Sequence, residues 1–346
     1  MDKIPDEMRP GEYLENVSEV GGLSQILVKT DEETDPKYGC IPEKRPIDEF
    51  IRKGIVNIDK PHGPSSNQVA SWVKGILHVE KAGHSGTLDP GVTGVLPIAI
   101  EEATRITKIL LSSKKEYVAL MKIHEDVPKQ RITEILRYFM GEIYQKPPLK
   151  SSVKRQLRKK NIYQIKILDI EDGFVLFSVS CEAGTYIRKL CHDIGLILGC
   201  GAHMQELRRV RVGSLDENNI VKLHDLKDAY EIYLECGNES YLRNCIIPME
   251  NSLGHLKKIW IKDTAVGAIC HGAALNAPGV SKLQAGIEQG DVVSILSLKN
   301  ELVAVGRSLR DSKEIHDMDK GKVVDLERVV MERGLYPDKW HSRGIN

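Results

Sequence analysis

Apolar residues recur with helical spacing in several stretches of this chain. Ser65 and Gln68 have the spacing of a capping box, and the apolar residues after them follow the pattern i, i+3, i+4, i+7, i+8. These residues are Val69, Trp72, Val73, Ile76 and Leu77. The pattern predicts a helix with one buried face. Similar spacing predicts helices at about 130–140 and after the turn at 183–185, and we expect a short helix near 101–111.

Other stretches alternate between apolar and polar residues, which is typical of strands with one buried face. This alternation covers Lys115 to Ile123 and Phe174 to Cys181. Short apolar runs at 55–58 and 95–100 predict buried strands. The sequence therefore predicts an α+β core.

A domain boundary is expected near residues 246–256. Beyond it, short strands are predicted at 258–261, 291–296 and 301–307, and glycine and proline residues separate them. This spacing favours a small, barrel-like β domain.

Composition narrows the class of protein. With 346 residues, 41% hydrophobic and 28% charged, the chain is expected to be globular with two or three domains. No apolar run is long enough to span a bilayer, and the polar first ten residues do not resemble a signal peptide. The seven cysteines include no C-x-x-C pair, and the spacing of Cys191, His192, Cys200 and His203 matches no common zinc site. Free thiols indicate a reducing compartment, so we expect a cytoplasmic protein.

Charge is balanced overall but unevenly distributed. Lys plus Arg and Asp plus Glu both number 49. Residues 1–50 carry 13 acidic and 6 basic side chains, whereas residues 105–160 carry 15 basic and 5 acidic ones. The basic middle of the chain indicates an anionic partner.

One loop, at residues 83–94, combines four glycines with Pro90 and a single carboxylate, Asp89. A rigid loop of this kind before a buried strand is a plausible place for chemistry. The alternative is an ordinary Asp-Pro-Gly turn in which the aspartate bonds its own backbone. A phosphate-binding loop is disfavoured because the Gly-Lys-Ser/Thr ending is missing.

Five segments together resemble the motifs of TruB-type pseudouridine synthases, in the order found in that family. They are Val56–Pro61, the loop Gly83–Pro97, Lys115–Tyr117, Ala183–Leu190 and Gly201–Arg209. The C-terminal part resembles a PUA domain, an RNA-binding module, through Asp263–Val266, Cys270–Ala273, Pro278–Val280, Gly290–Val293 and Gly306-Arg307.

Within the family, the chain is similar to the archaeal counterpart of dyskerin, the catalytic subunit of H/ACA ribonucleoproteins. An acidic, proline-rich extension precedes Ile51, and Gln145–Pro148 continues directly into Ser151–Arg155. The resemblance implies an N-terminal extension (1–50), a pseudouridine synthase domain (51–255), a PUA domain (256–334) and a tail (335–346). The implied fold is α+β, with a mixed, largely antiparallel sheet in the core and a small β-barrel PUA domain.

The resemblance also assigns roles to individual residues. Asp89 would be the nucleophile, attacking either the ribose or the uracil, Arg188 would pair with it, and Tyr117 would stack on the flipped base. Substrate-binding roles would fall to Lys60, Pro61, His84, Tyr186 and Leu207. Contacts with the RNA backbone would come from Lys150, Lys154, Arg155, Arg158, Arg208, Arg209, His271 and Gly272.

The implied activity is isomerisation of specific uridines, at uridine 55 of the tRNA T loop, in rRNA under guidance, or both. No metal or organic cofactor is expected, because nothing is oxidised and no group is transferred from outside. Expected partners are tRNA, rRNA, an H/ACA guide RNA and small accessory proteins, with no membrane. The alternative is a catalytically silent RNA-binding scaffold.

Overall fold

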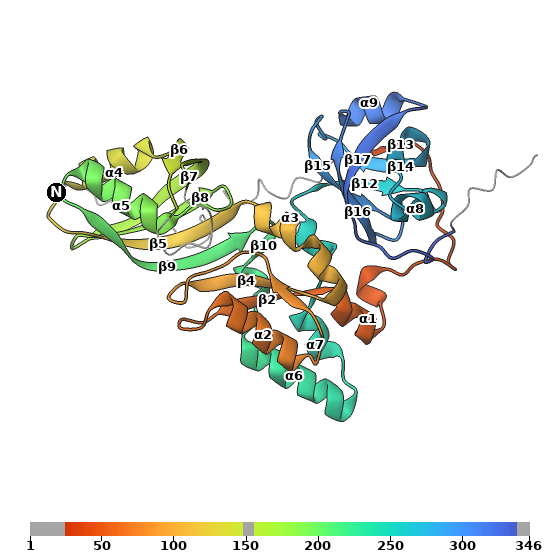
Figure 1. Cartoon of the computed structure of the whole chain (residues 1–346), viewed down its shortest axis with the longest axis horizontal. Coiled ribbons are helices and arrows are strands. Elements are labelled where there is room, and N and C mark those ends of the chain that lie inside the picture. Colours follow the sequence, from red (N-terminus) through yellow and green to blue (C-terminus); the bar gives the residue numbers. More distant parts are fainter. Residues whose placement is uncertain (1–24, 148–155, 338–346) are drawn as a thin grey trace, which may run out of the picture. The chain divides into compact units, whose positions relative to one another are not determined.

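The computed structural model describes residues 25–147 and 156–337, and these form two compact units (Figure 1). The larger unit comprises Gly39–Leu256 and Lys299–Leu302. The smaller unit takes the described parts of Met1–Tyr38, Lys257–Leu298 and Val303–Asn346. Within the described residues, no helix has the length and apolar character needed to cross a membrane.

A ten-stranded sheet forms the centre of the larger unit. Its main path runs β11-β2-β4-β9-β5-β8-β7-β6, while β3 pairs with β4 and β10 with β9. The strands are β2 (Gly54–Lys60), β3 (Ala82–His84), β4 (Thr93–Ile100), β5 (Lys115–Ile123), β6 (Gly141–Gln145), β7 (Arg158–Glu171), β8 (Phe174–Cys181), β9 (Ala202–Val212), β10 (Leu215–Asp216) and β11 (Ile247–Pro248). Only the β4–β9 pair is parallel among these neighbours. The predicted mixed, largely antiparallel sheet is confirmed.

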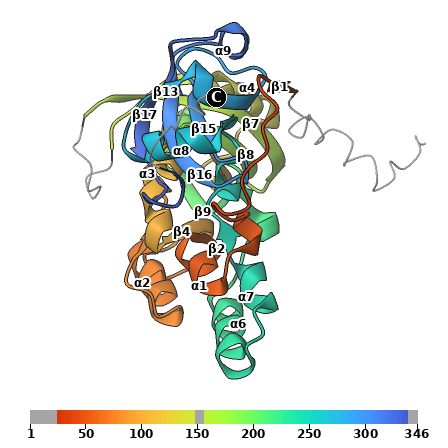
Figure 2. The same ribbon diagram turned by 90° about the vertical axis from the view of Figure 1, so that its right-hand side faces the viewer.

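Helices cover the two halves of this sheet separately. Around β2 and β4 gather α1 (Ile47–Arg52), α2 (Ser66–Ile76), α6 (Leu223–Cys236) and α7 (Ser240–Cys245) (Figure 1 and Figure 2). The other half carries α4 (Lys129–Tyr138) and α5 (Ile187–Leu198), and each half has its own hydrophobic core. Tyr117 and Leu207 pack against both cores, so they lie at the junction of the two halves.

Several elements follow the sequence pattern closely. The capping box before α2 forms in both directions: Gln68 N donates to Ser65 Oγ at 3.2 Å, and Ser65 N donates to Gln68 Oε1 at 2.8 Å. The strands predicted at 115–123 and 174–181 have those bounds. The apolar face of α2 is narrower than expected, because Trp72 is 47% exposed. The helical region near 101–111 divides into the 3-10 turn η3 (Glu101–Ile106) and α3 (Thr107–Ser112).

The smaller unit is a seven-stranded sheet curled around one core, in the order β1-β14-β12-β15-β16-β17-β13. Its elements are β1 (Ile26–Val28), β12 (Lys257–Ile261), α8 (Asp263–Cys270), β13 (Leu275–Asn276), the 3-10 turn η6 (Ala277–Gly279), β14 (Val280–Gln284), β15 (Val292–Leu296), β16 (Leu302–Ser308), α9 (Ser312–Asp317) and β17 (Lys322–Val329). The N-terminal strand β1 pairs antiparallel with β14 through Ile26 and Gln284. Residues from both ends of the chain therefore complete one sheet.

Three short 3-10 turns complete the larger unit: η2 (Pro42–Lys44), η4 (Glu217–Asn219) and η5 (Asn251–Leu253).

A buried ion pair joins the first and last segments of the larger unit. The Arg45 guanidinium donates to both carboxylate oxygens of Glu250, at 3.1 and 2.7 Å, and the side chains are 2% and 4% exposed. Leu302 N donates to the same carboxylate at 3.1 Å. This pairing fixes the segment before α1 against the end of the unit.

Candidate active site

A buried lysine binds the backbone of the loop that carries Asp89. Lys60 ends β2 and is fully buried, and its Nζ donates to the carbonyl oxygens of Pro61, Pro90 and Val92 at 3.0, 3.0 and 2.9 Å. Burial lowers the pKa of Lys60, while the negative charge of Asp89 acts in the opposite direction. Lys60 thus organises the loop backbone on either side of the carboxylate.

A second support comes from the first turn of α2. The buried hydroxyl of Ser66 donates to Leu88 O at 3.1 Å and accepts from Leu88 N at 2.8 Å. The turn itself is closed by backbone atoms, since Val92 N donates to Asp89 O at 2.9 Å. The Asp89 carboxylate is therefore left to bond outside its own loop, unlike the aspartate of an ordinary Asp-Pro-Gly turn.

That carboxylate pairs with Arg188, as predicted. Arg188 lies in the first turn of α5, 99 positions along the chain, and its Nη2 donates to Asp89 Oδ2. Both side chains are more than half exposed, at 55% for Asp89 and 58% for Arg188. Exposed ion pairs contribute only about 0–1 kcal/mol to folding. Stability is therefore a weak explanation for bringing these two residues together.

Tyr117 is near enough to Asp89 for the charge of that carboxylate to act on its phenol, and it lies opposite a buried arginine. Tyr117 on β5 lies opposite Arg209 on β9 in the sheet, and the positive charge of Arg209 acts on the phenol. Burial raises the pKa of Tyr117, so the phenol stays protonated at neutral pH. Arg209 also donates to Val95 O at 2.8 Å and to Gly86 O at 3.2 Å. It thereby links the strand opposite Tyr117 to both sides of the Asp89 loop.

The prediction that Arg209 contacts the RNA backbone is wrong. Its side chain is part of the protein interior, with only 1% of the residue exposed, and it donates to the carbonyl oxygens of Val95 and Gly86. Burial lowers the pKa of Arg209. The close β4–β9 approach here needs Gly94, because a Cβ at that position would lie 2.2 Å from Arg209 O, and its φ is +98°.

His84 lies at the start of the loop, and both of its ring nitrogens have partners. Gly86 N donates to His84 Nδ1 at 3.4 Å, and His84 Nε2 is 2.9 Å from Asn67 Oδ1, which suits a ring protonated on Nε2. Burial and the nearby charge of Arg209 lower the pKa of His84. Pro61 is exposed in the segment between β2 and α2, while Tyr186 and Leu207 are half-buried.

The remaining candidates for RNA contact differ in their surroundings. Arg208 bonds two carboxylates, at 3.0 Å to Asp59 and 2.6 Å to Glu217. Arg158 is exposed at the start of β7, and His271 and Gly272 are exposed after α8 in the smaller unit. Lys150, Lys154 and Arg155 lie outside the described residues.

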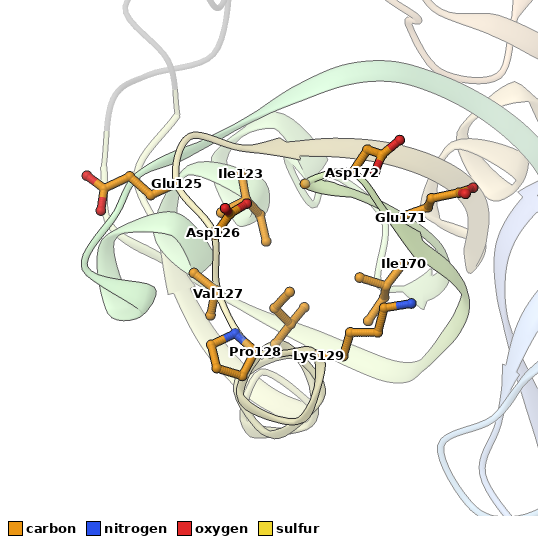
Figure 3. Close-up of a pocket in the computed structure, with 11 residues that line it drawn as sticks. Ile123, Glu125, Asp126, Val127, Pro128, Lys129, Ile170, Glu171 and Asp172 are labelled. Atoms are coloured by element: carbon orange, nitrogen blue, oxygen red, sulfur yellow. The ribbon is translucent and has the colours of Figure 1, made fainter.

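A separate pocket of about 570 Å³ lies between the segment after β5 and the β7–β8 turn (Figure 3). It is lined by Ile123, Glu125, Asp126, Val127, Pro128, Lys129, Ile132, Ile170, Glu171, Asp172 and Gly173. Of the described candidate residues, none lines it. Four carboxylates against one lysine also make it a poor site for phosphates. Nor do the described residues contain a cluster of three or more His, Cys, Asp or Glu suited to a metal ion.

Two residues that shape the site, Ser66 and Gln145, are not among the residues predicted from the sequence. The carboxamide of Gln145, at the end of β6, bonds the backbone of Tyr186. In the sequence, Gln145 stands out only as the first residue of the segment Gln145–Pro148. Nothing in its local sequence indicates a partner 41 positions away.

Comparison with protein families divides the chain into four matches. The TruB family pseudouridylate synthase N-terminal domain matches residues 74–187, and the tRNA pseudouridylate synthase B C-terminal domain matches 188–254. A PUA domain matches 257–330 and a DKCLD (NUC011) domain matches 18–70.

Full-length relatives and solved structures agree with these matches. The chain is 54% identical over 316 residues to the probable tRNA pseudouridine synthase B of Methanopyrus kandleri, covering 91% of this chain and 94% of the relative. The Pyrococcus furiosus protein of the same name is 53% identical, covering 92% and 94%. A chain in a crystal structure of a Cbf5-Nop10-Gar1 complex is 53% identical with a TM-score of 0.85, covering 91% and 96%. Another, in an H/ACA ribonucleoprotein bound to a substrate RNA containing 2'-deoxyuridine, is 51% identical with a TM-score of 0.84, covering 91% and 97%.

Proposed function

The chain belongs to the TruB family of pseudouridylate synthases, and we propose that Asp89 is the nucleophile with which it isomerises specific uridines of tRNA and of guided rRNA. The reaction breaks the bond between ribose and uracil N1, rotates the base and joins the ribose to C5. The C5 proton is lost and N1 gains one, so no cofactor is consumed.

The observation that carries this proposal is the meeting of Asp89 and Arg188 on an exposed surface beside Tyr117. A carboxylate needs no separate activating base to act as a nucleophile, and the planar guanidinium orients it. Tyr117 would stack on the flipped uracil, and Tyr186 and Leu207 would line its surroundings. His84, being neutral, would occupy the space that the extruded nucleotide leaves.

Lys60 would act through the loop, because its ammonium is fully buried, and Pro61 would form the adjoining wall. Arg158 and Arg208 would contact RNA phosphates, together with Lys150, Lys154 and Arg155 from the segment outside the described residues. His271 and Gly272 would contribute in the PUA domain, which we assign to residues 256–334 and expect to hold an RNA end.

The substrates and partners rest on the relatives. Two of them are named tRNA pseudouridine synthase B, and two solved relatives belong to a Cbf5-Nop10-Gar1 complex and to an H/ACA particle with substrate RNA. We therefore propose tRNA and guide-directed rRNA as substrates, small accessory proteins of the H/ACA type as partners, and the cytoplasm as the compartment. All seven cysteines are free thiols, which supports a reducing compartment.

The test replaces Asp89 by Asn and by Ala in the full chain. Unmodified tRNA, and rRNA target with guide RNA and accessory proteins, are incubated with each variant, and pseudouridine is quantified. Both substitutions should abolish pseudouridine while RNA affinity persists, and Asp172→Asn, at an exposed turn, should behave like the wild type. Pseudouridine formation by Asp89→Ala would refute the assignment. An inactive wild type that binds RNA would favour the scaffold alternative.

A further inference from the structure

Gln145 is a buried polar residue whose whole carboxamide is directed at one other residue. It is 2% exposed at the end of β6. Its Nε2 donates to Tyr186 O at 3.1 Å, and Tyr186 N donates to its Oε1 at 2.9 Å. A carboxamide has one donor side and one acceptor side, so this pair of bonds fixes both the position and the direction of the Tyr186 backbone.

Tyr186 is the residue from which α5 begins. Its carbonyl also accepts from Leu190 N at 3.0 Å, the first backbone hydrogen bond of the helix. The Tyr186 side chain makes no capping bond to the helix, and the Tyr186 backbone N–H donates to the Gln145 carboxamide. Arg188, which pairs with Asp89, lies two residues further on.

The turn leading into α5 is held from the neighbouring strand β7. Lys160 Nζ donates to Glu182 Oε1 at 2.6 Å and to Ala183 O at 2.7 Å. The Thr185 hydroxyl donates to Glu182 O at 2.7 Å. The edge strand β6, through Gln145, and its neighbour β7, through Lys160, thus both hold the segment 182–186.

We infer that Gln145 is a positioning residue for pseudouridine formation: by fixing the Tyr186 backbone it sets the first turn of α5 and thereby places Arg188 against Asp89. This inference rests on the proposed function of Asp89 and Arg188. An exposed ion pair is too weak to hold its own geometry, so its alignment depends on the backbones that present the two side chains. A displacement of about 1 Å at a reacting group can lower a rate about 100-fold.

Two substitutions separate the bonds from the bulk of the side chain. Gln145→Met is similar in length and removes both bonds. Gln145→Glu keeps an acceptor for Tyr186 N, but its second oxygen repels Tyr186 O until the carboxyl is protonated. A buried carboxylic acid has a raised pKa, so lowering the pH restores the donor.

The assay is the single-turnover rate of pseudouridine formation at saturating RNA, on the substrate that the wild type modifies. Gln145→Met should be slower by about 10- to 100-fold with unchanged RNA affinity. The Gln145→Glu variant should recover toward the wild-type rate as the pH falls from 8 to 6, a profile that neither the wild type nor Gln145→Met shows. Gln164→Met, an exposed position on β7, is the matched control.

A double-mutant cycle with Arg188→Lys tests whether the effect of Gln145 on the reaction passes through Arg188. If Gln145 acts through Arg188, adding Gln145→Met to Arg188→Lys should slow the reaction far less than adding it to the wild type. Full additivity, or a wild-type rate for Gln145→Met, would overturn the inference.

Hydrogen exchange gives a readout that does not depend on activity. The Leu190 amide should exchange faster in Gln145→Met than in the wild type, and in Gln145→Glu it should be protected at low pH only. Unchanged exchange would overturn the inference even if the wild type were inactive, a result that counts separately against the proposed function. Should Gln145→Met fail to fold, Gln145→Glu at low pH provides the comparison.

Discussion

Replacing Lys60 by Met should loosen the Asp89 loop by an amount that the structure allows us to work out. The substitution keeps an unbranched, apolar side chain in the space and removes three hydrogen bonds from the buried ammonium. Water can replace the bonds to the exposed residues Pro61 and Pro90, at roughly 1 kcal/mol each, but the Val92 carbonyl is left buried and unsatisfied, at about 1–3 kcal/mol. Relief of the desolvation of the ammonium offsets part of this loss, which leaves about 2–3 kcal/mol.

The loosening is measurable at a single amide. Val92 N donates to Asp89 O at 2.9 Å, so its exchange with deuterated solvent reports opening of the turn. A loss of about 2–3 kcal/mol corresponds to roughly 30- to 150-fold faster exchange. Lys74→Met, at an exposed lysine of α2, should leave this rate unchanged. Exchange in Lys60→Met within a factor of three of the wild type would show that the ammonium does not hold the loop.

Two further predictions concern other buried charges of the larger unit. Glu250→Leu leaves the buried Arg45 without its carboxylate partner and should lower the free energy of unfolding, measured by urea titration, by about 3–5 kcal/mol. Adding Arg45→Met should recover part of this loss, because it removes the unpaired charge. Equal stability of Glu250→Leu and the wild type would contradict this prediction. Burial lowers the pKa of Lys115 from 10.5 to about 7, so between pH 7 and 10 the unfolded chain binds more protons and this residue makes stability increase with pH. The free energy of unfolding of the wild type relative to that of Lys115→Met should therefore increase from pH 7 to pH 10. A constant difference would show that folding does not lower the pKa of Lys115.

Local pattern predicted those elements whose faces differ clearly in polarity. The helix after Ser65 and the strand from Lys115 to Ile123 have one apolar side, and both form as predicted. By contrast, β7 and β9 were not predicted as strands, because most of their side chains are exposed or half-buried and many carry charge. These segments are strands because β7 pairs with β8 and β9 pairs with β5. A short stretch of sequence contains no information about such pairing.

The candidate site shows the same division. Residues with a motif around them, such as Asp89 and Arg188, could be named from the sequence, and the fold brings them together. Arg209 also lies in one of the motifs but is buried, so the prediction from its residue type, that it contacts the RNA backbone, is wrong. Gln145 has no charge and no periodicity to mark it, and its partner Tyr186 lies 41 positions away at the start of α5.

The strand β1 has a consequence for how the chain is made. Ile26 leaves the ribosome early, yet its partner Gln284 is synthesised 258 residues later. Residues 39–256, nearly all of the larger unit, are by then complete and able to fold. At synthesis rates of about 5–20 residues per second, the N-terminal strand therefore waits some tens of seconds as an unpaired edge. A fragment beginning at residue 257 would lack this strand permanently, which leaves β14 as an open edge prone to pairing with other chains.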